Sequence, residues 1–350
     1  MRAAALWPLA LLLAISACGL FGPEEDGKVD PLSFTWTVDT LYYPGSLQIA
    51  MSNIWGASPK DVYTVGHNSN GAKMFHYDGK IWNPVALGVT RGGTTITTSF
   101  GMEDVYGFAG DDIWAVGYHR NLGLSNTSLV IHYNGYQWAE SDTIEDEWLF
   151  SIGGSSSDDF WVGGMNGILY HYNGSDFTLY PMPVDIDSTD YHYIKAIAGS
   201  KNGIAYALLH NPSGGGYPQT YLLKFEAGTW ELIEEAPFLT WSNIWLSPTG
   251  TLYAAGAYHL DRWENGSRTT LLDSTWYQNI HGISDADFYL SGRNNPYDMT
   301  VTVWHYNGTE FRRLPIPEVK DAYTAGIWTD GKEVFILAVI GNSTVVLHGK

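Results

Sequence analysis

Cysteine and positive charge are scarce in this 350-residue chain, and each scarcity excludes a class of protein. The single cysteine excludes an intrachain disulfide, a cysteine-based zinc site and a Cys-x-x-Cys redox pair. Only 18 lysines and arginines stand against 37 aspartates and glutamates, and the formal charge of −19 repels a phosphate backbone, which excludes nucleic acid as a partner. Charged residues make up 16% of the chain and hydrophobic residues 45%, so the chain is expected to fold.

One long hydrophobic run is present, and it lies at the N-terminus. Arg2 precedes an apolar segment at 3–14, which is too short to span a bilayer as a helix and has the pattern of a secretory signal peptide. The run ends in Ile15-Ser16-Ala17-Cys18, which resembles the lipobox of bacterial lipoproteins. The resemblance implies cleavage before Cys18 and lipidation of that cysteine. A buried free thiol behind an ordinary secretory signal is the alternative.

These features also predict the cellular location of the protein and its domain boundaries. Several acyl chains hold a protein stably on a membrane, so the chain is expected to be lipid-anchored to the bacterial cell envelope. In such lipoproteins Gly19 after the cysteine implies the outer membrane, on its periplasmic side or at the cell surface. Residues 19–31 are rich in Gly, Pro and charge, which is typical of a flexible tether. We predict a signal peptide at 1–17, the lipidated cysteine and its tether at 18–31, and one folded domain at 32–350.

A single pattern recurs seven times in the folded domain. Its first half, I-W-G-A-S-P-K-D-V-Y-T-V-G at 54–66, predicts two β-strands joined by a tight turn. Its second half is His-Tyr-Asp/Asn-Gly followed by an aromatic residue, and Asp-Gly or Asn-Gly between apolar segments is the strongest short hairpin signal. Each repeat therefore contains four strands, with a period of about 45 residues. The copies begin at Ile54, Val105, Ile152, Ile197, Ile244, Ile280 and Ile327.

The ends of the domain predict how the ring of repeats closes. The seventh repeat stops directly after its hairpin turn, at Gly349-Lys350, and lacks a fourth strand. Residues 34–38 form a strand without a repeat and are expected to complete that sheet, which removes an exposed edge. The predicted fold class is all-β, a single seven-bladed β-propeller with four antiparallel strands per blade, closed by its N-terminal strand. Over 32–350 the repeats resemble the blades of secreted Kelch-like and Asp-box-like propellers, although the turn is one residue shorter than an Asp-box and the WD dipeptide is absent.

Residues that recur in most blades are expected to serve the blade rather than a ligand. The histidines of the second half are interpreted as structural groups with satisfied hydrogen bonds: His76, His132, His171, His305 and His348. The aspartates before the second strand are interpreted as turn-closing residues: Asp61, Asp112, Asp159 and Asp287. Function is therefore expected where the blades differ.

The blades differ in the links on one face, which carry the second strand to the third and one blade to the next. Variable loops on a rigid scaffold are common binding sites. The candidate ligand-binding residues that follow the second strands are His67, Asn68, Tyr118, His119, Arg120, His210, Asn211, Tyr258, His259, Arg293 and Asn294. Aromatic residues, which suit sugar stacking and protein hot spots, precede the first strands at Trp148, Tyr193, Trp241, Trp276 and Tyr323.

Three functions remain open from the sequence. The leading hypothesis is a non-catalytic binding or scaffold lipoprotein that presents this face to a glycan or an envelope protein. The alternative is a carbohydrate-active enzyme, a polysaccharide lyase or glycoside hydrolase, with His119, His210 or His259 as base and Tyr118 or Tyr258 as partner. A structural subunit of an envelope complex is the third hypothesis, and it predicts a broad apolar patch.

No cofactor or metal is predicted. A copper-radical oxidase is excluded because its Tyr–Cys crosslink has no cysteine other than Cys18. The acidic segment at 185–190 departs from an EF-hand loop and lacks its turn glycine, so we interpret it as a solvated loop.

Overall fold

The computed structural model describes residues 29–350 except 92–93, 97–98, 121–126, 142–143, 145–147, 188, 200–201, 214–216, 239 and 274. The predicted signal peptide, the lipidation site at Cys18 and most of the tether therefore lie outside the described residues. In the described part of the chain, no helix is long and apolar enough to cross a membrane.

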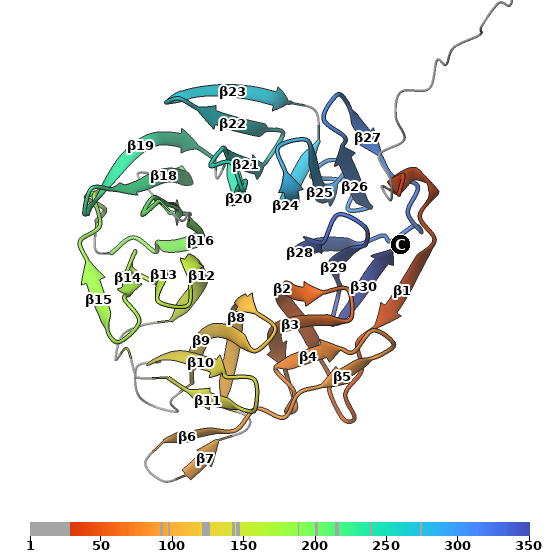
Figure 1. The fold of residues 1–350 in the computed structure, drawn as a ribbon, viewed down its shortest axis with the longest axis horizontal. Helices are drawn as coiled ribbons and strands as arrows, with labels where there is room; N and C mark the ends of the chain where they lie inside the picture. Colours follow the sequence, from red (N-terminus) through yellow and green to blue (C-terminus); the bar gives the residue numbers. More distant parts are fainter. Residues whose placement is uncertain are drawn as a thin grey trace, which may run out of the picture.

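Seven four-stranded antiparallel sheets stand in a ring around a central axis (Figure 1). Six of them use four consecutive strands, from the axis outward. Blade 1 consists of β2 (Ile49–Ser58), β3 (Asp61–Asn68), β4 (Met74–Tyr77) and β5 (Trp82–Pro84), and blade 2 of β8 (Phe100–Ala109), β9 (Asp112–His119), β10 (Thr127–Tyr133) and β11 (Trp138–Glu140). Blade 3 consists of β12 (Leu149–Ser156), β13 (Asp159–Gly164), β14 (Leu169–Tyr172) and β15 (Phe177–Tyr180). Blade 4 consists of β16 (Tyr193–Gly199), β17 (Ala205–Asn211), β18 (Gln219–Glu226) and β19 (Thr229–Pro237).

The remaining blades complete the ring. Blade 5 consists of β20 (Trp241–Leu246), β21 (Leu252–Gly256), β22 (Leu260–Glu264) and β23 (Ser267–Leu272), and blade 6 of β24 (Trp276–Ser284), β25 (Asp287–Arg293), β26 (Val301–Tyr306) and β27 (Phe311–Arg313). Blade 7 consists of β28 (Ala322–Thr329), β29 (Val334–Ile340), β30 (Ser343–Gly349) and the N-terminal β1 (Trp36–Thr40). A 3-10 turn, η1 (Pro31–Ser33), precedes β1, and a hairpin of β6 (Val89–Arg91) and β7 (Thr94–Ile96) links blades 1 and 2. The predicted fold class is confirmed.

The N-terminal strand closes the ring as the sequence predicts. β1 pairs antiparallel with β30, from Trp36 opposite Gly349 to Thr40 opposite Val345. The strand begins two residues later than expected, because Phe34 turns into the hydrophobic core of blades 6 and 7. The backbones of Thr35 and Lys350 exchange two further hydrogen bonds, of 2.8 and 3.2 Å. The two ends of the domain are therefore held in one sheet.

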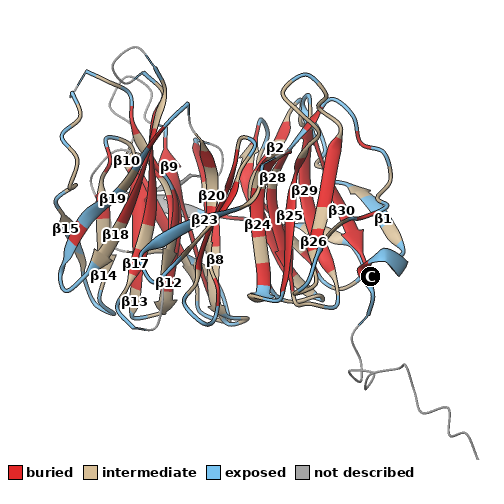
Figure 2. Ribbon diagram, turned by 90° about the horizontal axis from the view of Figure 1, so that it is seen from above, coloured by how far each residue is buried: buried red, intermediate tan, exposed pale blue. Residues whose placement is uncertain are grey.

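The hydrophobic core lies between neighbouring blades. In one cluster Tyr63 and Met74 of blade 1 pack with Val105 and Ile113 of blade 2. Figure 2 shows that the buried residues run along the strands through the depth of the ring. The apolar positions of the repeat thus form the contacts between blades. A ligand site is therefore expected in the loops of one face or along the central axis.

The recurring histidines and aspartates bond to one another. In each pair the imidazole Nε2 meets a carboxylate oxygen, and the ring packs on the repeat's aromatic residue, as His132 does on Trp114 at 4.0 Å. The N···O distances are 2.7 Å for His76–Asp61, 2.8 Å for His132–Asp112, 2.7 Å for His171–Asp159, 2.8 Å for His305–Asp287 and 2.6 Å for His348–Glu333. The aspartates were expected to close turns, and the structure shows them instead as partners of the histidines one hairpin further along the chain.

Candidate functional site

Each innermost strand carries a β-bulge at the same place, where one extra residue interrupts its pairing with the second strand. In β8, for example, the register shifts between Met102 and Asp104, so Glu103 is the extra residue. A bulge re-aims the side chain it inserts. Over blades 1 to 7 the inserted residues are Ser52, Glu103, Phe150, Lys195, Ser242, Gln278 and Ala325. Five of them, those of blades 1 to 4 and 7, line a cavity of about 240 Å³ on the axis.

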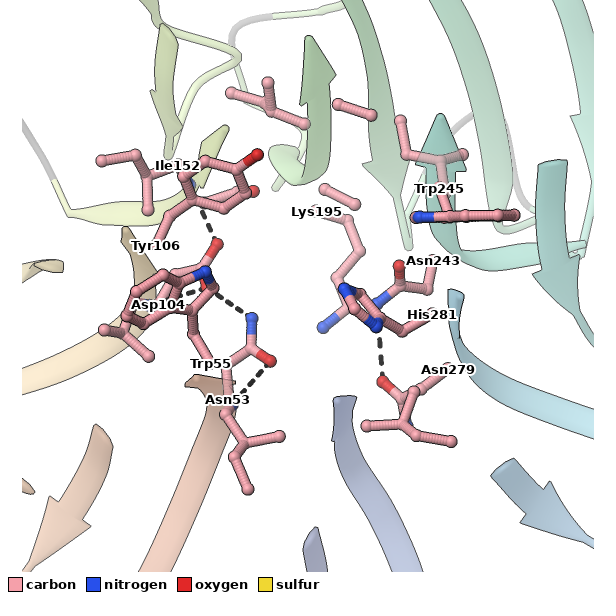
Figure 3. A pocket seen from close by; sticks show the side chains of 18 of the residues that line it. Asn53, Trp55, Asp104, Tyr106, Ile152, Lys195, Asn243, Trp245, Asn279 and His281 are labelled. Atoms are coloured by element: carbon pink, nitrogen blue, oxygen red, sulfur yellow. Dashed lines mark hydrogen bonds between the residues drawn. The ribbon is translucent and has the colours of Figure 1, made fainter. Parts of the chain in front are cut away.

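The residue after each bulge joins neighbouring blades around this cavity. Asn53 donates its amide to the Asp104 carboxylate, whose other oxygen accepts from the Ile152 backbone N–H at 2.9 Å (Figure 3). Across the axis Asn243 donates to Asn279 at 3.4 Å, and Asn279 donates to the Thr324 carbonyl at 2.9 Å. Burial raises the pKa of Asp104 to about 6, and these hydrogen bonds hold it from rising further. The Asp104 carboxylate is therefore a structural link between blades 1, 2 and 3.

Two inserted residues bring charge into the cavity. Burial raises the pKa of Glu103 to about 7, while Lys195 and a hydrogen bond from Ser52 oppose the rise. Lys195, from blade 4, points into the cavity (Figure 3) and its side chain is exposed. Within the described residues, neither group forms an ion pair. The cavity therefore holds an acid and an ammonium that influence each other without contact.

A chain of aromatic rings extends from Phe150, which lines the cavity together with Glu103. Trp148 stacks on Tyr118 at 4.0 Å and lies 6.1 Å from Phe150, which lies 5.1 Å from Tyr193. Tyr191 follows, 5.4 Å from Tyr193. The Glu103 charge adds to burial in raising the pKa of Tyr118, Tyr191 and Tyr323, so these rings share its surroundings. We call Tyr118, Trp148, Phe150, Tyr191, Tyr193 and Tyr323 the aromatic mouth.

The opposite end of the cavity is lined by larger rings that pack between blades. A Cβ on Gly107 of blade 2 would lie 2.3 Å from the Trp55 ring of blade 1, so only glycine fits there. Trp328 of blade 7 covers Gly56 of blade 1 in the same way. His281 accepts a hydrogen bond from the Thr329 N–H at 3.2 Å, and burial lowers its pKa to about 4, so it is neutral at physiological pH. These residues close the interfaces rather than offer charge to a ligand.

The structure brings four of the predicted aromatic residues to one place. Tyr118, Trp148, Tyr193 and Tyr323 belong to the aromatic mouth. Trp276, Tyr258 and Arg293 form a second group in blades 5 and 6, with Tyr258 5.5 Å and the Arg293 guanidinium 4.7 Å from the Trp276 ring. Trp241 is fully buried and its indole donates to Asp261 at 2.8 Å, so it offers no surface to a ligand.

The three histidines predicted as possible bases lie in different blades, and none lines the axial cavity. His119 of blade 2 is 2% exposed, with its Nε2 3.7 Å from Glu140. His210 of blade 4 is 4% exposed and its Nε2 lies 2.7 Å from the Trp241 carbonyl; burial lowers its pKa to about 4. The backbone of His259 forms a tight turn with Gly256 in blade 5.

The predicted polar residues serve mainly the loops. Asn68 is buried and accepts from Asn70 N–H at 2.9 Å, and buried Asn211 accepts from Ser213 N–H at 3.2 Å. Asn294 donates to Asp298 at 2.6 Å. His67 is half-buried, and burial, then Lys73 and Arg120, lower its pKa. Lys73 and Arg120 thus bring positive charge close to a neutral His67 in an otherwise acidic protein.

Sequence reasoning missed the inserted residues, above all Glu103 and Lys195. Their signal is present two positions before the first Ile or Val of each repeat. There the seven copies read Ser, Glu, Phe, Lys, Ser, Gln and Ala. Extending the comparison of the repeats by two residues would have shown that blades 2 and 4 carry opposite charges at this position.

No model of a known protein family and no curated protein matches the chain. Solved structures do. One titled YCF48 bound to D1 peptide has a TM-score of 0.58 and 14% identity, over 91% of this chain and 97% of that one. The extracellular domain of the hybrid two component system BT4673 from B. thetaiotaomicron has a TM-score of 0.58 and 14% identity, over 89% of this chain but only 39% of that one.

A GH74 enzyme from Niastella koreensis also matches, with a TM-score of 0.60 and 12% identity, over 82% of this chain and 52% of that one. At these identities the likeness concerns the fold. The class is therefore a seven-bladed β-propeller resembling those of Ycf48 and BT4673. Because an enzyme matches as well as a peptide-bound protein, the fold does not choose between binding and catalysis.

Proposed function

We propose that this chain is a binding propeller of the bacterial cell envelope, anchored through a lipid on Cys18, which holds a protein or glycan ligand at the aromatic mouth. The observation that carries the proposal is the mouth itself, a group of rings from blades 2, 3, 4 and 7 of which Phe150 lines the polar cavity. Tyr191 is 46% exposed and Tyr323 43% exposed, so both offer ring surface. Tyrosine supplies such contact area at low entropic cost in protein and sugar recognition.

Two further points support binding. The complex of Ycf48 with a D1 peptide indicates that a propeller of similar architecture holds a polypeptide. The second carboxylate of the cavity, Asp104, already accepts from Asn53 and from two backbone N–H groups, at Ile152 and Val105. A paired acid and base, which a glycoside hydrolase needs, would have to come from Glu103 and another group.

The alternative, a carbohydrate-active enzyme that uses the same face, has one observation in its favour. A carboxyl group with a pKa of about 7 in a concave site is suited to general-acid catalysis at neutral pH. This version of the alternative makes Glu103 the acid, whereas the sequence suggested a site with His119, His210 or His259 as the base.

The test is a binding and degradation screen with purified residues 19–350 on glycan and peptide arrays and on soluble polysaccharides. The double variant Tyr191→Ala/Tyr323→Ala is expected to weaken binding at least about tenfold, as for hot-spot residues. Tyr136→Ala is the matched control, because Tyr136 is 93% exposed in a hairpin turn of the opposite face. Equal losses in both variants, or no ligand in any array, would contradict the proposal. Product formation that Glu103→Gln abolishes would establish the enzyme instead.

A further inference from the structure

Glu103 and Lys195 face the same cavity from two blades that do not touch each other. They are the inserted residues of blades 2 and 4, and the inserted residue of blade 3 between them is Phe150. Lys195 stabilises the charged form of Glu103, yet in the described part of the chain neither side chain has an ion-pair partner. A gap bordered by an acid, an aromatic ring and an ammonium is therefore built into the channel.

The surroundings of each charge differ in a way that favours a ligand with two charges. Phe150 lines the cavity together with Glu103, and ring contacts connect it through Trp148 to Tyr118; aromatic rings near a carboxylate stabilise an ammonium through their negative faces. On the other side, the Lys195 ammonium can donate hydrogen bonds to an anion. It influences His210, whose Nδ1 lies 3.5 Å from the Tyr193 Oη. A ligand with a single negative charge would leave the buried Glu103 carboxylate without a partner, which is costly, and one with a single positive charge would forgo the exposed Lys195 ammonium; only a ligand with both charges pairs both groups.

We propose that the channel binds a small zwitterion, a free amino acid or a short peptide, with its ammonium against Glu103 and its carboxylate against Lys195. Phe150, the inserted residue of the blade between them, lines the same cavity, as do Asn53 and Asn243. This inference deepens the proposed function, because it names the chemistry of a ligand that the same mouth admits. The cavity volume of about 240 Å³ restricts the ligand to a small molecule such as an amino acid or a short peptide.

The length of the ligand follows from the separation of the two charges. Each residue added to a peptide moves its ammonium and carboxylate apart by up to about 3.5 Å. A series of L-alanine, dialanine and trialanine therefore distinguishes a free amino acid from a peptide. The tightest member reports the span between Glu103 and Lys195.

The experiment is calorimetric titration of residues 19–350 with this series and with two single-charge compounds, N-acetyl-L-alanine and L-alaninamide. We expect one member of the series to bind at least about tenfold more tightly than either single-charge compound. Glu103→Gln should abolish the preference for the free amine, and Lys195→Met the preference for the free carboxylate. Ser242→Ala, at the inserted position of blade 5, is the matched control and should bind as the wild type does.

Two results would overturn the inference. One is equal affinity for the zwitterions and the single-charge compounds; the other is no heat of binding for any of the five at millimolar concentration. The comparison among compounds uses the wild-type protein, so it remains decisive even where a variant fails to fold. A failure here leaves the array result for Tyr191 and Tyr323 in force, whereas loss of both results would reject the mouth as a binding site.

Discussion

At the scale of single residues, Glu103 combines a strongly raised pKa with a position in the axial cavity. Burial raises its pKa to about 7, against 4.5 for an ordinary glutamate. Between about pH 5 and 7 the folded protein therefore holds a proton that the unfolded chain has released. The unfolded state binds fewer protons in this window, so the free energy of unfolding falls as pH rises through it.

The variant Glu103→Gln tests this prediction because glutamine has no charge to bury. We expect it to match the wild type near pH 4.5 and to be more stable by about 1–3 kcal/mol at pH 8. Urea unfolding at both pH values measures the difference. The control is Glu231→Gln, at an exposed position of β19, which should show no such dependence. Asp104 remains in both proteins, so the comparison reports the titration of Glu103 together with its effect on the neighbouring Asp104. A difference that is constant with pH would contradict the assignment.

The repeat pattern predicted that the recurring histidines are structural, but it did not predict which carboxylates they bind. The histidines were expected to be structural, and each bonds to a carboxylate, as His305 does to Asp287. The carboxylate partner was not predictable, because the two residues lie 12 to 20 positions apart and meet only after the hairpin forms. Glu103 was missed for a related reason. Period-two alternation would place positions 103 and 105 on one sheet face, and the bulge breaks that alternation.

At the scale of elements, β1 carries the closure of the ring. It covers the outer edge of β30 through five residue pairs, and Phe34 and Trp36 pack on the core of blades 6 and 7. An uncovered edge strand is a template for association with another chain. Sequence reasoning predicted this strand because the seventh repeat lacked one. It did not predict the β6–β7 hairpin, which has no counterpart among the described residues of the other links.

Removal of β1 tests the closure. A chain that begins at residue 41 should unfold at least about 5 °C below a chain that begins at residue 29, since the loss of five residue pairs and of the Phe34 and Trp36 core contacts should reach the roughly 3 kcal/mol that such a shift requires in a domain of this size. It should also associate through β30. Differential scanning calorimetry measures the first effect and light scattering the second. Equal melting temperatures and monomers in both cases would show that three strands suffice in blade 7.

At the scale of the whole molecule, the propeller has two unlike faces. One face carries the short turns within blades, and the other carries the links on which the aromatic mouth stands. The blade count, strand order and choice of face followed from the repeat, because periodic apolar positions and Asn-Gly turns fix them locally. The axial cavity did not follow, because it is formed by residues from all seven blades and no local pattern describes it.

This arrangement predicts how an anchored molecule would stand. β1 begins opposite Gly349, at the face of the short turns, and the C-terminus lies at that face too (Figure 2). A tether that leads from Cys18 into β1 therefore reaches the propeller on the side away from the mouth. A lipid on Cys18 would leave the ligand-binding face pointing outward from the membrane, so anchoring and binding should be independent.

The variant Cys18→Ser separates the two properties. If Cys18 is lipidated, the wild-type protein should sediment with bacterial membranes and be released by detergent, because a multiply acylated protein does not leave a bilayer on its own. Cys18→Ser should instead appear in the soluble fraction. Its affinity for any ligand found in the array screen should equal that of the purified domain, because the mouth lies on the opposite face from the tether. Ala17→Ser, which keeps a small residue before the cysteine, is the control and should remain with the membrane. Membrane association that persists in Cys18→Ser would mean that the hydrophobic segment at 3–14, or the propeller itself, provides the attachment.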